Sequence, residues 1–273
     1  MTADSPTTLG TIFADTFKPV IGMLHLPALP GSPGHGRAAA KARAQVLRDA
    51  RALSAAGVDG LMLENFGDVP FHAGRVPATT VAQMTAIALA VREAVDVPLG
   101  INVLRNDGRS ALAVAQAVGA SFIRVNVLHG AVLADQGVIQ GEAAALLRER
   151  VMLGATSIRI FADVQVKHAA PLADWPVAEQ VADLLHRCLA DALIVTGEAT
   201  GRPTDPQCLA QVKHAAGSAG VLVGSGVTAE SVRGLADHAD GFIVGTFFKR
   251  DGQVSAPVDG ERVRSLLSAL GRG

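Results

Sequence analysis

The sequence predicts a single (β/α)8 barrel of the phosphate-binding type, a fold of the α/β class. Eight short apolar segments alternate with eight helix-patterned segments along the chain. The length of 273 residues is close to the roughly 250 residues typical of this fold. Glycine-rich turns follow the last two apolar segments. Eight β/α units in a chain of this length favour a closed barrel over an open sheet.

Each predicted strand is a nearly continuous apolar run rich in Val, Ile and Leu, as expected of parallel strands that are buried on both faces. In chain order, the strands are expected at residues 19–26, 60–66, 98–104, 122–128, 158–165, 192–197, 221–227 and 241–248. No GxGxxG motif opens the helix after the first strand, which counts against the alternative, an open dinucleotide-binding sheet.

The predicted helices are rich in alanine, and several end at a glycine just before the next strand. They are expected at residues 37–56, 79–95, 110–118, 141–153, 176–189, 205–216, 229–238 and 259–270. No shift in composition divides the chain. We therefore assign residues 18–273 to the barrel and residues 1–17 to an N-terminal extension, which we expect to be flexible.

The composition of the chain limits the classes of binding partner that are expected. The chain is 49% hydrophobic and 18% charged, with a net charge of −1 and no block of like charge, so neither nucleic acid nor an anionic membrane is expected as its main partner. Cys188 and Cys208 lack metal-binding spacing, and a reduced, cytoplasmic chain is the simplest interpretation. Neither a secretory signal nor a membrane span is recognisable. We expect a homo-oligomer from the habits of soluble proteins.

Two glycine-rich turns predict a phosphate site. The seventh strand ends in Gly224-Ser225-Gly226, and the eighth contains Gly245-Thr246, which are the positions where barrels of this type often bind phosphate. Glycine allows backbone N–H groups to converge on an anion, and the two hydroxyl groups add donors. A helix starting near Thr228 would turn its positive end toward the same place. Lys249 either completes the positive charge or is a solvated turn residue.

Polar residues cluster where the other strands end, which is where barrel enzymes place their functional groups. We take as candidate site residues His25, Glu64, Asn65, Asn102, Arg124, Asn126, Asp163, Lys167, His168, Thr196 and Glu198. Residues 26–34, which contain three prolines, could form a wall or lid. The loop at residues 200–203 could do the same, with Arg202 as a second anion contact.

Strand alternation places Arg124 inside the barrel if Asn126 faces inward. A buried guanidinium needs a partner because an unpaired buried charge is very costly. Glu64 and Asp163 are the candidate partners. Arg124 is therefore either a structural ion-pair residue or an anion-binding residue, and the sequence supports both equally.

Acid–base chemistry is the reaction type that these residues suggest. Asp163 or Glu64 would serve as the general base, with His25 or His168 as the acid partner. No cofactor is required. A divalent metal held by His25, Glu64 and Asp163 is a weaker alternative, because no local spacing supports it. Lys167 is either a Schiff-base nucleophile or, more in keeping with a loop lysine, a contact for substrate charge.

Several stretches resemble the BtpA/SgcQ family over about residues 18–265: VIGMLHLPALPGSPG at 20–34, ENFGDVPF at 64–71, GINVLRND at 100–107, IRVN at 123–126, FADVQVKH at 161–168 and IVTGEATG at 194–201. The resemblance implies a phosphate-binding barrel related to ribulose-phosphate-binding and indole-pathway enzymes. It also implies a role for the two glycine turns and for His25, Glu64, Asn65, Asp68, Asn102, Asn126, Asp163, Lys167, His168 and Thr196.

The same resemblance implies two activities that the residues do not support. One is photosystem I biogenesis by members extrinsic to the thylakoid membrane, and the other is nucleoside triphosphatase activity. The chain has no P-loop and no basic amphipathic helix. Our first hypothesis is an enzyme that acts on a phosphorylated sugar or ribosyl-like compound by isomerisation, lyase or aldol cleavage, or glycosidic cleavage. The second is a non-catalytic assembly factor that uses the barrel to bind a ligand or partner.

Overall fold

A computed structural model describes residues 8–14, 16–36, 39–197 and 204–272. It confirms the predicted barrel: eight parallel strands close on themselves, because β1 pairs with both β2 and β11. Around the barrel from β1, the order is β1, β11, β10, β9, β7, β4, β3, β2. Their bounds are Val20–His25 (β1), Gly60–Glu64 (β2), Leu99–Asn102 (β3), Phe122–Val125 (β4), Arg159–Asp163 (β7), Ala192–Val195 (β9), Gly220–Val223 (β10) and Gly241–Val244 (β11).

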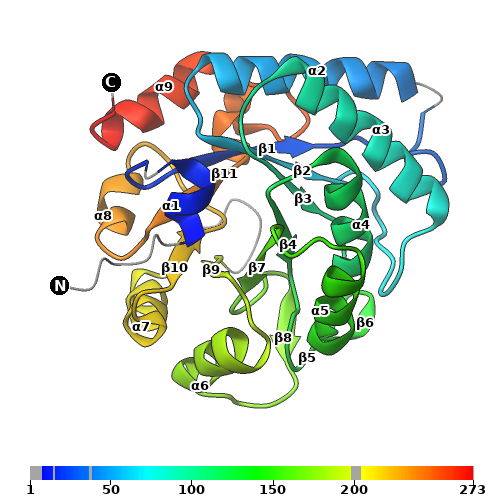
Figure 1. Ribbon diagram of the computed structural model, residues 1–273. Coiled ribbons are helices and arrows are strands. Elements are labelled where there is room, and N and C mark those ends of the chain that lie inside the picture. The colour runs from blue at the N-terminus through cyan, green and yellow to red at the C-terminus, as the bar shows by residue number, and fades with distance from the viewer. Residues whose placement is uncertain (1–7, 15, 37–38, 198–203, 273) are drawn as a thin grey trace.

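Helices surround the barrel and follow its strands in the expected order (Figure 1). They are α2 (Ala39–Ala55), α3 (Ala78–Ala94), α4 (Gly108–Val118), α5 (Ala143–Met152), α6 (Val177–Ala182), α7 (Pro206–Ala216), α8 (Val232–Ala236) and α9 (Gly260–Ala269), and α6 continues as a π-helical turn, η1 (Asp183–Arg187). Three helix starts are set by an aspartate that accepts a backbone N–H of the first turn, namely Asp107, Asp205 and Asp259. No described helix is long and apolar enough to cross a membrane.

A short helix that the sequence did not predict, α1 (Thr8–Phe13), closes the amino-terminal end of the barrel (Figure 1). Its Leu9 and Phe13 are buried. They occupy space that two inward-facing glycines leave open: a Cβ atom at Gly60 would lie 2.8 Å from Phe13 Cε1, and one at Gly220 would lie 2.9 Å from Leu9 Cδ1. Part of the N-terminal extension is thus built into the core.

Aromatic rings fill the middle of the barrel. Phe122 and Phe161 stack with ring centroids 4.6 Å apart, and Phe13 meets Phe122 edge to face. Gly100 makes room for them, since a Cβ atom there would lie 2.1 Å from the Phe122 ring. The barrel is therefore solid below its carboxyl end, and a ligand can enter only above this aromatic layer.

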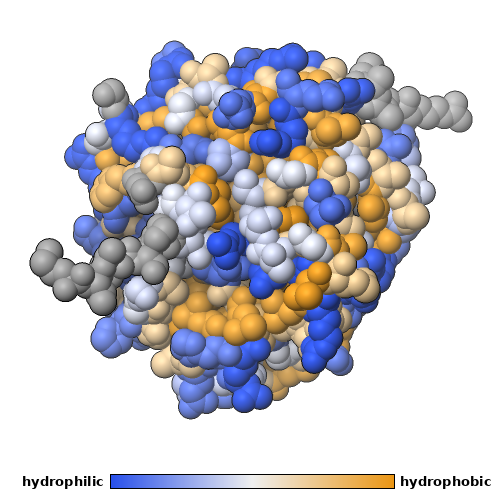
Figure 2. Space-filling model, in the orientation of Figure 1, coloured by the Kyte–Doolittle hydropathy of each residue, from blue (hydrophilic) through white to orange (hydrophobic). Residues whose placement is uncertain are grey.

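A second sheet, which was also not predicted, extends from the loops after β4 and β7. It consists of β5 (Ala131–Ala134), β6 (Gly137–Gln140) and β8 (Ala169–Pro171), paired antiparallel in the order β6-β5-β8. In Figure 1 it lies beside the barrel between α5 and α6. Figure 2 shows a mostly hydrophilic surface with an apolar area close to α6. The small sheet raises one wall at the carboxyl end of the barrel.

Candidate functional site

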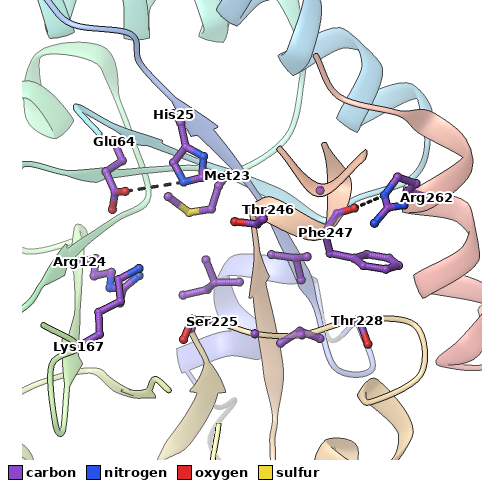
Figure 3. Close-up of a pocket in the computed structure, with 17 residues that line it drawn as sticks. Met23, His25, Glu64, Arg124, Lys167, Ser225, Thr228, Thr246, Phe247 and Arg262 are labelled. Atoms are coloured by element: carbon purple, nitrogen blue, oxygen red, sulfur yellow. Dashed lines mark hydrogen bonds and ion pairs between the residues drawn. The ribbon is translucent and has the colours of Figure 1, made fainter. Parts of the chain in front are cut away.

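A cavity of about 210 Å³ opens at the carboxyl ends of the strands (Figure 3). One side consists of the turns after β10 and β11, as the sequence predicted. The opposite side carries ionisable groups from β1, β2, β4 and the loop after β7, namely His25, Glu64, Arg124 and Lys167. The cavity therefore brings the two glycine turns together with four of the residues predicted at the other strand ends.

The turn side offers hydrogen-bond donors. Gly226 has a φ of 71°, a left-handed conformation that favours glycine. The Ser225 hydroxyl oxygen accepts the Gly197 N–H at 2.9 Å, so its own proton can be donated. A 3-10 helix, η2 (Thr246–Phe248), begins at the second turn. In the described part of the chain, no hydrogen bond takes up the backbone N–H of Thr246 or Phe247.

Gly224 and Gly245 have a steric role that the sequence did not suggest. Both sit at inward-facing positions, where a side chain would collide with the site itself. A Cβ atom at Gly245 would lie 2.7 Å from His25 Cε1, and one at Gly224 would lie 3.4 Å from Arg124 Nη2 and closer still to the side chain of Ile194. The Gly224 N–H also donates to the backbone of β9. Both glycines therefore make room for site residues, and the N–H of Gly224 is already used within the barrel.

Two basic residues differ from the sequence expectations. Lys249 neither lines the cavity nor is solvated: it is 1% exposed and its Nζ pairs with Asp49 Oδ2 at 2.5 Å. Arg262 on α9, which no motif had marked, lies at the cavity instead. Its Nε donates to the Phe247 carbonyl at 2.5 Å, and its guanidinium lies over the Phe247 ring, 4.6 Å from its centroid (Figure 3). Arg262 therefore fixes the turn after β11 through these two contacts with Phe247.

The helix after β10 begins later than expected. We predicted a helix from residue 229, close to Thr228, but α8 begins at Val232. Thr228 instead forms a local turn, in which its N–H donates to Ser231 Oγ at 3.0 Å. Since α8 spans only five residues, we assign no helix-dipole contribution to the cavity.

Arg124 forms the buried ion pair that alternation had suggested, with Asp163. Its Nε and Nη2 each donate to one carboxylate oxygen at 2.9 Å, and the two side chains are 2% and 0% exposed. Asn126 donates to the same carboxylate at 3.0 Å, and Asn102 donates to Asn126 Oδ1 at 3.1 Å. Arg124 also lines the cavity. Asp163 is held as the anchor of this network, so its oxygens are already occupied.

Glu64 is the carboxyl group without such partners. Glu64 is 4% exposed, and no described residue donates a hydrogen bond to its side-chain oxygens. The nearest point of its side chain to the His25 imidazole is Oε1, which lies 3.8 Å from His25 Nε2 (Figure 3). Burial raises the pKa of Glu64, an effect that the positive charges of Lys167 and Arg124 oppose. A buried carboxyl with a raised pKa binds its proton more tightly than an exposed one, which is a feature of carboxyl groups that transfer protons.

His25 is neutral in the folded protein. Burial, together with the positive charges of Lys249, Lys167 and Arg124, lowers its pKa to about 3. Its Nδ1 is buried and has no hydrogen-bond partner among the described residues. The expected role of His25 as an acid partner stays a prediction, and a neutral ring can exchange hydrogen bonds with Glu64 or a ligand.

Lys167 lies in the loop after β7 and extends toward the cavity (Figure 3). Burial lowers its pKa, and the nearby cations Arg124 and Arg105 add to this, whereas Glu64 and Asp163 oppose it. The buried Arg105 donates a hydrogen bond to the Lys167 carbonyl and so ties down the loop. Arg105 was not among the predicted site residues, although it lies within the stretch GINVLRND.

The remaining predicted residues lie elsewhere. Asn65 follows Glu64 and thus faces away from the barrel interior. On that outer side, its Oδ1 accepts a hydrogen bond from the Leu104 N–H at 2.7 Å, and its Nδ2 donates one to Asp68. Thr196 and His168 line a neighbouring cavity. Glu198 and Arg202 lie outside the described residues.

The alternative of a metal held by His25, Glu64 and Asp163 receives no support. The carboxylate of Asp163 already accepts three hydrogen bonds. Among residues 8–14, 16–36, 39–197 and 204–272, no three His, Cys, Asp or Glu side chains come together in a group that could bind a metal ion.

Fold and site together define a (β/α)8 barrel with a polar, cation-rich cavity at the carboxyl ends of its strands. The chain belongs to the BtpA family, whose model matches residues 16–272. It is 48% identical over 252 residues to an uncharacterized protein of Thermococcus kodakarensis, covering 92% of this chain and 94% of the relative. It is 43% identical over 258 residues to the photosystem I biogenesis protein BtpA of Synechocystis, covering 94% and 90%.

Solved structures show the same fold at low identity. N-(5'-phosphoribosyl)anthranilate isomerase from Pyrococcus furiosus aligns with a TM-score of 0.57 and 12% identity, over 93% of this chain and 98% of the other. Tryptophan synthase from M. tuberculosis aligns with a TM-score of 0.60 and 16% identity, over 96% and 99%. Their similarity to this chain lies in the barrel.

Proposed function

We propose that this protein is an enzyme that acts on a phosphorylated small molecule, of the sugar-phosphate type, by proton transfer at Glu64. The observation that carries the proposal is the position of Glu64. It is a buried carboxyl with a raised pKa and no hydrogen bond from any described residue, across a cavity from turns that present unused N–H groups. Structural carboxylates are normally satisfied, as Asp163 is here.

The phosphate would bind at the turns after β10 and β11. The donors there are the N–H groups of Thr246 and Phe247, the Ser225 hydroxyl and the guanidinium of Arg262. Converging backbone N–H groups and a cation are the usual elements of a phosphate site. Among the proteins that share the barrel, phosphoribosylanthranilate isomerase and orotidine 5'-phosphate decarboxylase carry a phosphate in the names of their substrates.

The chemistry would take place on the opposite side of the cavity. With a raised pKa, Glu64 is suited to take a proton from a carbon beside a carbonyl group, or from a hydroxyl, and return it elsewhere. Lys167, as a partly desolvated cation, would stabilise the negative charge that forms on oxygen. Asp163 would act as a positioning residue that holds Arg124. Isomerisation, lyase or aldol cleavage, and glycosidic cleavage all begin with such a step.

Calorimetry with ribose 5-phosphate and with inorganic phosphate tests the phosphate site. We expect both probes to bind to the wild type, and we expect Ser225→Asp and Gly226→Asp to abolish binding, because each places a carboxylate against the phosphate. Ser268→Asp on the exposed side of α9 adds the same charge away from the cavity and is the matched control. Unchanged affinity in both cavity variants would refute the phosphate assignment.

One finding favours a second candidate function: a relative 43% identical to this chain is named for photosystem I biogenesis. A non-catalytic assembly factor would not need the proton of Glu64. Expression in a Synechocystis strain that lacks its own relative separates the two functions. Restoration of photosystem I by wild type and Glu64→Gln alike would favour assembly, whereas restoration by wild type alone would favour the enzyme.

A further inference from the structure

A second cavity, about 670 Å³ in volume, adjoins the one just described. It lies between the ends of β4 and β7, the small sheet formed by β5 and β8, and the segment that leads into α6. Lys167 lines both cavities. The first cavity, at about 210 Å³, holds a phosphate and a few further atoms, so a larger ligand bound there would extend past Lys167 into the second.

The walls of the second cavity are largely apolar. They include Trp175, which is 39% exposed, and Leu172, which is 55% exposed, together with Val132, Val164, Val166 and Pro171. A large aromatic side chain left this open on the wall of a cavity is a common feature of ligand pockets, which are lined by apolar and aromatic side chains.

The position of Trp175 is fixed by its surroundings. Its carbonyl accepts a hydrogen bond from Gln180 Nε2 at 2.6 Å, and its ring meets the His129 ring edge to face, with centroids 5.2 Å apart. Gly130 lies directly against the indole: a Cβ atom there would be 3.5 Å from it, and the φ of 63° favours glycine. These contacts therefore hold the indole ring of Trp175 in one position on the cavity wall.

His129 adds an unused polar atom to this wall. Its Nδ1 is buried and has no hydrogen-bond partner among the described residues. Burial lowers the pKa of the ring, so the neutral imidazole has one donor and one acceptor nitrogen. A buried polar atom without a partner is uncommon in a folded protein, and a heteroatom of a ligand would satisfy it.

The charges on the walls of the second cavity do not favour a cationic occupant. Among its described lining residues, the only acidic one is Asp163, and its oxygens are occupied by Arg124 and Asn126. Lys167 lines the same cavity and forms no ion pair with another described residue. A neutral or anionic group with flat apolar faces and polar edges therefore fits the walls best.

From this geometry we propose that the substrate is a ribosyl phosphate that carries a planar heteroaromatic ring, with the ring bound in the second cavity against Trp175 and His129. This inference rests on the proposed phosphate site. The phosphate would bind at the turns after β10 and β11, and the sugar would pass Glu64 and Lys167. The bond between sugar and ring would then lie at the junction of the two cavities, within reach of the groups assigned to proton transfer.

The single tryptophan makes this testable, because the chain has one Trp and no Tyr. Its emission therefore reports on the second cavity alone. We expect uridine and adenosine 5'-monophosphates to quench Trp175 fluorescence, whereas ribose 5-phosphate, which lacks the ring, leaves it unchanged. By calorimetry, at least one of the nucleotides should bind at least tenfold more tightly than ribose 5-phosphate, a gain of about 1.4 kcal/mol that a stacked, buried ring can supply.

Two variants complete the test. Trp175→Ala should remove the advantage of the nucleotides and leave the affinity for ribose 5-phosphate unchanged. The control Val151→Ala also shortens an exposed apolar side chain, on α5, and should change neither affinity. Equal binding of ribose 5-phosphate and both nucleotides, with no quenching, would overturn the inference but leave the phosphate site standing. Failure of all three probes to bind would overturn both proposals.

Discussion

Replacing Asp163 with asparagine is expected to destabilise the barrel by about 3–5 kcal/mol, the cost of breaking a buried ion pair on one side. The structure supports the upper part of this range. Both side chains of the pair are almost fully buried, at 2% and 0% exposure, and the carboxylate accepts two hydrogen bonds from Arg124 and one from Asn126. Asparagine would leave the guanidinium uncompensated and would turn an NH₂ group toward a donor.

Urea unfolding followed by Trp175 fluorescence and by circular dichroism measures this loss. A native protein of ordinary stability has about 5–15 kcal/mol, so the shift of the midpoint would be large. The matched control is Glu261→Gln, which breaks an ion pair whose side chains are 54% and 82% exposed and should cost less than about 1 kcal/mol. A loss in Asp163→Asn no larger than in this control would refute the assignment of Asp163 as a buried anchor.

Four further predictions concern the core and the pH dependence. Phe13→Ala should lower the free energy of unfolding in urea by about 3–5 kcal/mol, because it empties the closed end of the barrel. Gly245→Ala should lower it by about 1–3 kcal/mol, because the added methyl group would press on the His25 ring. Losses below about 1 kcal/mol would contradict both predictions. The pKa of His25 falls from 6.5 to about 3 on folding. Its contribution to the free energy of unfolding is therefore complete above pH 6.5 and is lost as the pH falls toward 3. His25→Gln should consequently make the urea midpoint depend less on pH in acid. The pKa of Glu64 is raised from 4.5 in the folded protein, so ionised Glu64 destabilises the fold at a pH above its folded pKa. Glu64→Gln should therefore be more stable than the wild type at neutral pH and equally stable in acid. Lower stability of the variant at neutral pH would count against a strained, functional carboxyl.

The barrel could be predicted because its signal is local and repeated. Each strand had to be apolar on both faces, and several helices ended at a glycine, so eight units were visible without any knowledge of contacts. The missed elements lack such signals. The α1 helix, Thr8–Phe13, is six residues long and is stabilised by the space above Gly60 and Gly220, which only the closed barrel creates. The strands β5, β6 and β8 are three or four residues long.

The candidate site was predictable as far as strand alternation reaches. Alternation placed Arg124 inside the barrel, where its charge needs a carboxylate partner, and the structure pairs it with Asp163, one of the two candidates. It could not say which carboxylate Arg124 would take, because that depends on distances between strands. Asn65 had been grouped with Glu64 although neighbouring strand residues face opposite sides. Arg262 gave no sequence signal, since it is one basic residue on an amphipathic helix, and its role arises from the Phe247 turn.

A crystal structure with ribose 5-phosphate bound tests the central claim most directly. The account predicts the phosphate at the turns after β10 and β11, within hydrogen-bond distance of the Thr246 and Phe247 N–H groups and Arg262, with the sugar directed toward Glu64. A phosphate bound elsewhere, or a sugar directed away from Glu64 into solvent, would contradict it.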